Sequence, residues 1–153
     1  MDERQAILDI LDVIDNNQSE FQIISSLYQI NQLYSKLRSK NTSANLQEAL
    51  PTSIAFCETH AGNTIKSNPV YKSLADELLA KSNIRDQDDA NHIVIACIRD
   101  VDYFITTDSE LYRDKVDDIK TALIPILNQM SRIQGIEILN PIPFPSVMRR
   151  GFS

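Results

Sequence analysis

The segment from residue 90 to residue 106 constrains the fold of this chain more than any other. Residues 90–99 have the length of a helix that is apolar on nearly every side, so this helix must be largely buried. The run DYFIT at 102–106 predicts a short strand, and a second one is predicted at 136–139, where Pro141 stops it. Short apolar strands that alternate with helices predict an α/β domain with a short, mostly parallel sheet.

The spacing of apolar residues predicts further elements in the N-terminal half. Helices are expected at 3–15, 27–37 and 46–58, with Pro51 best placed in a first turn. A short buried strand is expected at 21–24. These elements continue the α/β pattern.

In the C-terminal half, helices are predicted at 71–81 and from Ser109 to roughly Arg132, the second one bent at Pro125. The 153 residues have an ordinary globular composition, 42% hydrophobic and 24% charged. A chain of this size buries a sizeable core, so we expect a single domain over 1–153.

The sequence predicts a cytoplasmic protein without a membrane segment. No apolar run approaches the ~18 residues that a membrane helix needs. The charged start MDER lacks the basic beginning and apolar core of a signal peptide. The two cysteines, Cys57 and Cys97, make no disulfide framework, which fits a reducing compartment.

The formal net charge of −6 argues against a protein that coats nucleic acid without regard to sequence. Such proteins are basic, because neutralised phosphates supply most of their affinity. An acidic balance permits a nuclease whose carboxylates hold a divalent metal, since the metal then meets the phosphates. It equally permits a protein that never contacts nucleic acid.

Two carboxylates are the candidates for chemistry. Asp89 opens the buried helix, and Asp108 lies just past the carboxyl end of the strand that follows this helix. Ligand sites of open α/β sheets gather at that edge, so one helix and one strand can return the two acids to the same rim. Hard oxygen ligands of this kind suit Mg²⁺ or Mn²⁺.

The same acids also have a purely structural interpretation. Asp86, Asp88 and Asp89 lie at a helix start, where negative charge is favoured by the helix dipole. Thr107 and Glu110 have the spacing of a capping box, with Thr107 as the cap.

Two histidines invite a metal-binding interpretation. His92 lies one turn beyond Asp89 on the apolar helix, which predicts a buried, hydrogen-bonded core residue. Cys57 and His60 form one Cys-x-x-His pair, whereas a structural zinc site needs four ligands.

The order and spacing of these motifs resemble a known family. DANH at 89–92, Ala96, DYFITTD at 102–108 and Leu111 resemble the PIN-domain pattern Asp-Ala-x-His…Asp-Tyr-Phe-x-Thr-x-Asp-x-x-Leu. GIEILNP at 135–141 resembles the closing strand of that family and its Asn-Pro end. The resemblance implies a PIN-like three-layer fold in which helices flank a short parallel sheet.

PIN domains gather acids from four positions around Mg²⁺ or Mn²⁺ and cleave RNA. By this resemblance Asp89 and Asp108 match the third and fourth acids and would be the catalytic and metal-holding pair. Thr106 and Thr107 would support the rim through their hydroxyls, and Asn31 stands where the second acid, a Glu, would be.

The first acid of the family lies on a strand that precedes the helix at residue 3. This N-terminal strand is expected to be missing here, because the chain begins at that helix. His92 and Asp102 match family positions to which we assign structural roles.

The resemblance implies a Mg²⁺-dependent endoribonuclease, similar to the toxins of toxin–antitoxin pairs, with RNA as substrate and an antitoxin-like protein as partner. The unmatched acids leave a second interpretation open, a non-catalytic PIN-like module that forms a homodimer or binds a protein partner. A third is a generic α/β domain whose acids are helix caps.

Overall fold

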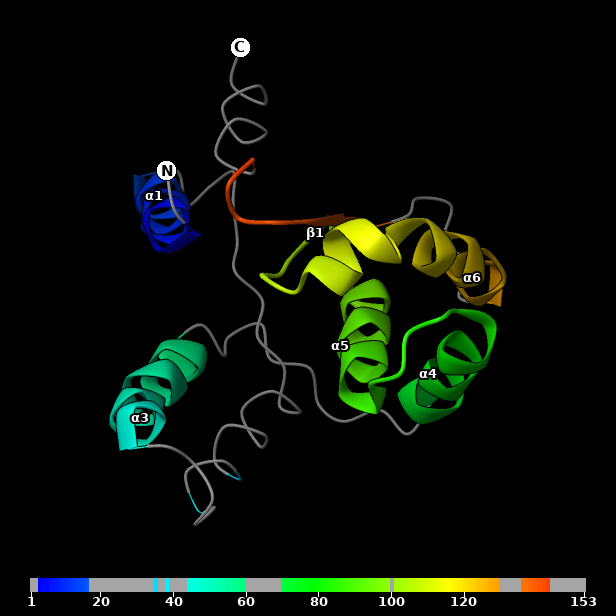
Figure 1. Ribbon diagram of the computed structural model, residues 1–153, viewed down its shortest axis with the longest axis horizontal. Coiled ribbons are helices and arrows are strands. Elements are labelled where there is room, and N and C mark those ends of the chain that lie inside the picture. The colour runs from blue at the N-terminus through cyan, green and yellow to red at the C-terminus, as the bar shows by residue number, and fades with distance from the viewer. Residues whose placement is uncertain are drawn as a thin grey trace. The chain divides into compact units, whose positions relative to one another are not determined.

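The computed structural model describes residues 3–16, 35, 38, 44–59, 70–99, 101–129 and 136–143. The chain forms two compact units, one made of Met1–Gln22 with Val70–Ser153 and the other of Ile23–Pro69 (Figure 1). The predicted strand at 21–24, most of the predicted helix at 27–37, Asn31 and His60 lie outside the described residues. The expectation of a single domain stays a prediction.

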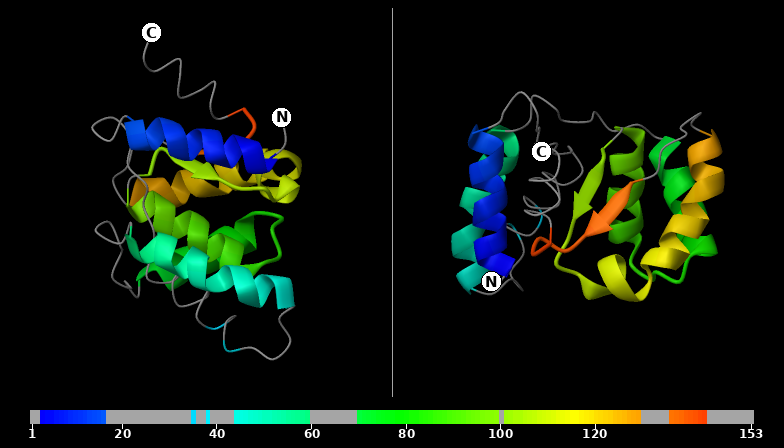
Figure 2. Two further views of the ribbon diagram at one scale, coloured as in Figure 1. Left: turned by 90° about the vertical axis from the view of Figure 1, so that its left-hand side faces the viewer. Right: turned by 90° about the horizontal axis from the view of Figure 1, so that it is seen from above.

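The centre of the first unit is α5, Gln87–Ile98, which buries seven of its residues. It begins three residues before the predicted start at 90, because Asp86 caps it from outside. Helices α4 (Val70–Lys81) and α6 (Val116–Gln129) lie on its far side from the strands (Figure 2). The expectation that the segment 90–99 is largely buried is therefore confirmed.

The two predicted C-terminal strands are present and pair in parallel. β1 is Tyr103–Ile105 and β2 is Glu137–Leu139, with Phe104 opposite Ile138 in the register. This small parallel sheet, set among helices, makes the unit broadly α/β, as the alternating pattern predicts.

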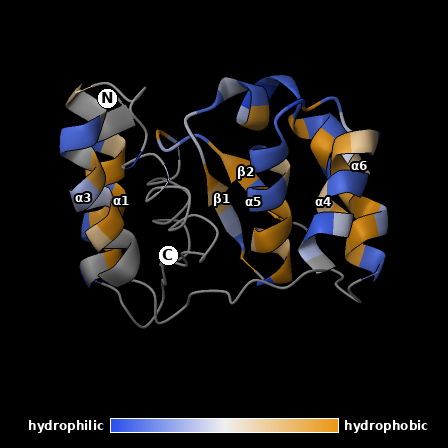
Figure 3. Ribbon diagram, turned by 90° about the horizontal axis from the view of Figure 1, so that it is seen from below, coloured by the Kyte–Doolittle hydropathy of each residue, from blue (hydrophilic) through white to orange (hydrophobic). Residues whose placement is uncertain are grey.

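Helix α1, Glu3–Asn16, is the amphipathic helix expected at 3–15. Its buried Ile10 packs against Ile105 and Leu139 from the two strands. Side chains alternate between the faces of a strand, so Ile138, the neighbour of Leu139, faces the opposite way and is buried. The strand pair therefore contributes apolar side chains from both faces, and apolar residues occur in both strands (Figure 3).

The prediction of one long helix from 109 to 132 is wrong. A π turn labelled η2, Glu110–Asp114, is closed by Lys115, whose N–H donates to the carbonyl of Glu110 at 2.8 Å. Lys115 has φ −122° and ψ 10°, which are not helical values, so α6 starts afresh at Val116. Pro125 lies inside α6, and the interruption is ten residues before it.

Helix α3, Ala44–Thr59, is described within the second unit. It includes the predicted span 46–58 and buries Leu50 and Ile54. Pro51 lies inside this helix rather than in its first turn, contrary to the prediction. Among the described residues, no helix is long and apolar enough to cross a membrane.

We predict that Ile93→Ala destabilises the protein by about 2–5 kcal/mol. The side chain of Ile93 on α5 is fully buried, so its truncation leaves a cavity in the hydrophobic core. The matched control is Ile124→Ala on α6, whose side chain is 58% exposed and whose loss is expected to change the free energy of unfolding little. Chemical denaturation of both variants measures the difference. Equal effects of the two substitutions would contradict the central position of α5.

Candidate functional site

The carboxyl ends of β1 and β2 meet at one edge of the sheet. The N–H of Thr106 donates to the carbonyl of Leu139 at 3.0 Å, which continues the pairing just beyond both strands. The segments that follow, with Asp108 after β1 and Asn140 after β2, consequently leave the sheet side by side. This is the edge at which the sequence places the acids.

Asp86 fixes the start of α5 at this edge. Its Oδ1 accepts hydrogen bonds from the backbone N–H groups of Asp88 at 2.8 Å and of Asp89 at 3.4 Å. Asp89 therefore lies in the first turn of the helix, with its own N–H directed to a cap, and does not open the helix as predicted. Its carboxylate is half-buried, whereas Asp86 and Asp88 are exposed.

Asp108 fixes the turn after β1. Its N–H donates to Oγ1 of Thr106 at 3.1 Å, and its Oδ1 accepts from the N–H of Glu110 at 3.0 Å. The expected capping box with Thr107 as the cap is therefore wrong, because Asp108 takes the bond to Glu110 two residues on. Thr107 is exposed beside it.

The two acids act on each other electrostatically. Burial, as the largest cause, and the negative charges of Asp86, Asp108, Glu110 and Asp88, in that order, together raise the pKa of Asp89 from its ordinary 3.8 to about 6. Two of these charges, Asp108 and Glu110, come from the segment that follows β1 in the chain, whereas Asp86 and Asp88 belong to the start of α5. The fold therefore gathers at Asp89 a field of negative charge that favours a proton or a cation.

A lysine links the two sides of this acidic edge. Nζ of Lys115 lies 2.7 Å from Oε1 of Glu110 and donates to the carbonyl of Asn83, in the loop before α5. The side-chain amide of Asn83 in turn donates to Asp118 at 2.8 Å. The two contacts of Asn83 hold the start of α5 near η2 and α6, and sequence periodicity does not predict them, because they join residues 32 and 35 positions apart.

The donor set fits a hard divalent cation only if other ligands complete it. Asp89 and Asp108 supply carboxylate oxygens, which Mg²⁺ and Mn²⁺ prefer, and Mg²⁺ commonly binds through one or two carboxylates with water and phosphate oxygens. Within the part of the chain that the structure describes, no three His, Cys, Asp or Glu side chains form a ready-made metal cluster.

The remaining predicted residues have structural surroundings. His92 is half-buried, less than the core position expected from the apolar helix. Asp102 is exposed, and its backbone carbonyl accepts from the N–H of Glu137 at 3.0 Å, which begins the pairing of the strands. The structural role expected for Asp102 stays a prediction, and this backbone hydrogen bond is consistent with it.

We predict that the Asp89 carboxyl titrates with a midpoint of about 6 in the metal-free protein. In Asp108→Asn the midpoint falls, because one of the charges that oppose ionisation is gone. Carbon-detected NMR of the carboxyl groups measures both midpoints. The matched control, Asp117→Asn in the first turn of α6, should leave the midpoint of Asp89 unchanged. If the midpoint is also unchanged in Asp108→Asn, the charge of Asp108 does not affect the ionisation of Asp89, and the prediction is wrong.

The same pKa predicts how stability depends on pH. Since the pKa of Asp89 is higher in the folded protein than its ordinary value, the stability it contributes is present below about pH 4 and is lost as the pH rises through about 6. Asp89→Asn removes this ionisation, so its melting temperature relative to wild type rises between pH 4 and pH 7. Asp76→Asn on α4 is the exposed control. A difference in melting temperature between Asp89→Asn and wild type that does not change with pH would contradict the prediction.

Comparison with models of protein families, with curated proteins and with solved structures finds no match to this chain.

Proposed function

We propose that this chain is a PIN-like protein of the metal-dependent ribonuclease lineage, in which Asp89 and Asp108 together hold one Mg²⁺ or Mn²⁺ ion. The observation that supports the proposal is that Asp108, just past the carboxyl end of β1, lies near enough to Asp89 for its charge to raise the pKa of Asp89, although the two acids come from separate motifs, DYFITTD at 102–108 and DANH at 89–92. Sites for ligands in α/β sheets gather at that edge.

The surroundings of each acid fit a role as a ligand. The exposed Asp108 is oriented by the hydroxyl of Thr106, which accepts its N–H, and Thr107 lies exposed on the same turn. The half-buried Asp89 is held by the capped first turn of α5. Asn31 would join this set by resemblance, as an amide in place of a carboxylate.

The chemistry expected of the site is hydrolysis of a phosphodiester in RNA. A bound divalent ion supplies charge stabilisation to the phosphate and a more acidic water. The residues of the chain hold that ion, and their mutual repulsion is relieved when it binds. In a chain with a net charge of −6, such an ion would offset the repulsion between the carboxylates and the phosphate.

The rest of the proposal rests on the family resemblance. It includes a cytoplasmic location, an antitoxin-like protein partner and a resemblance to the toxins of toxin–antitoxin pairs. These three expectations are implied by the motifs at 89–92, 102–108 and 135–141 alone.

A second candidate is a non-catalytic module that forms a homodimer. It is favoured by helix α1, where the large apolar side chains of Ile7 and Leu8 are 40% and 50% exposed while Ile10 is buried against the strands. Exposed apolar side chains that adjoin one another are a feature of protein interfaces. A second copy of this chain would cover them.

We predict that the wild-type protein binds Mn²⁺ in calorimetric titration and that Asp108→Asn weakens this binding at least about tenfold, because one of two charged ligands is lost. Asp117→Asn, which removes an equal charge at the exposed start of α6, is the matched control and keeps wild-type affinity. Cleavage of RNA, assayed in parallel, should follow the same order.

Binding of Mn²⁺ that is equal in wild type and Asp108→Asn would exclude this pair as the metal site. Absence of binding at millimolar metal would leave Asp86 and Asp108 as caps of their turns and would favour the interaction module.

For the second candidate, we expect a mass above 17.3 kDa in size-exclusion chromatography with light scattering. Leu8→Glu should return the protein to the monomer mass, since a charge is placed in the apolar contact. Gln5→Glu on the same helix adds a charge at an exposed polar position and serves as the control. A wild-type monomer at all concentrations would exclude the homodimer.

A further inference from the structure

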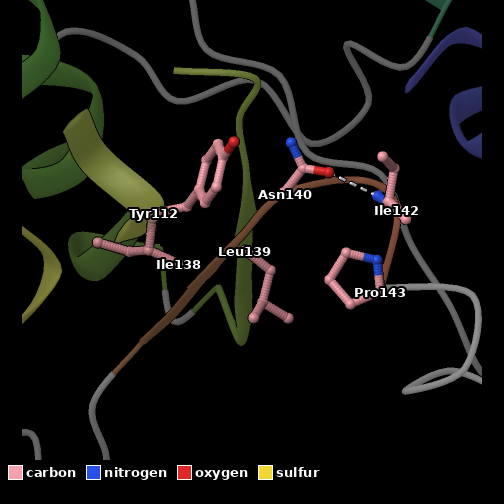
Figure 4. Close-up of a pocket in the computed structure, with 6 residues that line it drawn as sticks. All are labelled: Tyr112, Ile138, Leu139, Asn140, Ile142 and Pro143. Atoms are coloured by element: carbon pink, nitrogen blue, oxygen red, sulfur yellow. Dashed lines mark hydrogen bonds between the residues drawn. The ribbon is translucent and has the colours of Figure 1, made fainter. Parts of the chain in front are cut away.

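A pocket of about 410 Å³ lies where β2 leaves the sheet (Figure 4). The described residues that line it are Tyr112, Ile138, Leu139, Asn140, Ile142 and Pro143. The volume is within the range of small-molecule sites. Among these lining residues none carries a charge, although the chain as a whole is acidic.

The lining combines one aromatic ring, apolar walls and one amide. The ring of Tyr112 comes from η2, and the amide of Asn140 comes from the end of β2 (Figure 4). The amide oxygen of Asn140 accepts from the N–H of Ile142 at 2.9 Å, which fixes the turn and with it the rim of the pocket. A ligand that suits this lining is a flat, uncharged aromatic ring with polar atoms on its edge. Such a ring can stack on the side chain of Tyr112 and place its polar edge near the amide of Asn140.

The pocket and the acidic edge share one turn of the chain. The N–H of Tyr112 donates to the carbonyl of Asp108 at 3.2 Å, so the ring begins one turn after this carboxylate. Residues four apart on a helical turn are neighbours on its surface. π turns of this kind occur often at functional sites, where they redirect side chains.

We propose that this pocket takes a nucleobase of the nucleic-acid chain whose phosphate is brought to Asp89 and Asp108. The inference rests on the proposed function for its second half, because the polynucleotide proposed there as substrate joins each base to a phosphate. It adds the requirement that one base near the cleaved bond is unpaired, since a base within a duplex cannot stack on Tyr112.

The first test uses free nucleosides, which carry the base without phosphate. Saturation-transfer NMR is recorded on wild-type protein in EDTA with adenosine, guanosine, cytidine or uridine, and with ribose at the same concentration. At least one nucleoside should give saturation transfer concentrated on the protons of its base, and ribose should give none. Nucleosides that bind no better than ribose would overturn the proposal.

Variants of one residue identify the pocket. Tyr112→Ala should weaken nucleoside binding about tenfold, because the stacking ring is lost, whereas Tyr112→Phe keeps the ring and should stay within about threefold of wild type. The matched control is Tyr103→Ala on β1, which removes a tyrosine that is 38% exposed and does not line the pocket. Equal binding by Tyr112→Ala and wild type would overturn the assignment.

The variants are compared by circular dichroism and thermal melting, so that loss of folding is recognised. If Tyr112→Ala does not fold, the comparison of Tyr112→Phe with wild type and of nucleosides with ribose still decides the proposal.

The two proposals fail separately. EDTA removes divalent ions, so absence of nucleoside binding overturns the base pocket and leaves the metal titration of Asp108→Asn as it stands. Conversely, loss of metal binding with retained nucleoside binding overturns the acid pair and keeps the pocket. If no nucleoside binds, and if the wild-type protein is a dimer whereas Ile142→Asp has the monomer mass of 17.3 kDa, then the pocket is a contact between copies of this chain and the proposal is overturned.

Discussion

The parallel pairing of β1 with β2 is the contact on which the arrangement of both candidate sites depends. Its two flanking hydrogen bonds, from Glu137 to the carbonyl of Asp102 and from Thr106 to the carbonyl of Leu139, set the register from one end to the other. With two strands of three residues, hydrogen bonds alone would give a marginal sheet. Apolar burial on both faces, by Ile138 on one and by Leu139 against Ile10 on the other, supplies the remainder.

Local contacts hold the acids together against their own repulsion. The N–H groups of α5 bind the carboxylate of Asp86, and the positive end of the helix dipole favours negative charge there. Lys115 compensates Glu110 directly. Asp89 is left with burial and four negative neighbours, which accounts for a pKa of about 6 in a carboxyl that would otherwise titrate near 4. A carboxyl group whose surroundings oppose its ionisation in this way would be stabilised in its charged form by a bound cation.

The sequence was sufficient to predict α5, both C-terminal strands and the edge at which Asp89 and Asp108 lie. The apolar character of several successive residues predicts the helix and the strands, and Pro141 predicts where the second strand stops. Both signals can be recognised in a single sequence. The break at Lys115 within the helix expected at 109–132 was not predicted, and this residue donates to the carbonyl of Asn83, a contact made only in the folded chain. Periodicity cannot register such a contact.

The choice of cap shows a second limit. Thr107 and Asp108 are adjacent, and each has a side-chain oxygen that can reach the N–H of Glu110, one by a capping box and the other by a tighter turn. Only the direction of the backbone after β1 decides between them, and that direction is set by the bond from Asp108 to Thr106. The role of Asn31 lies outside the described residues and stays a prediction.

The net charge connects the two proposals. An acidic chain gains no general attraction for a polyanion, and its long-range field opposes the approach of RNA at low ionic strength. Affinity must then come from contacts that act at short range: a divalent ion between carboxylate and phosphate, and stacking of an uncharged base on an uncharged wall. Tyr112 follows Asp108 by one turn, so both contacts can act on neighbouring parts of one nucleotide chain. In these proposals the neutral lining of the pocket and the acidic edge beside it have complementary roles, because stacking would add affinity that the negative charge of the chain does not provide.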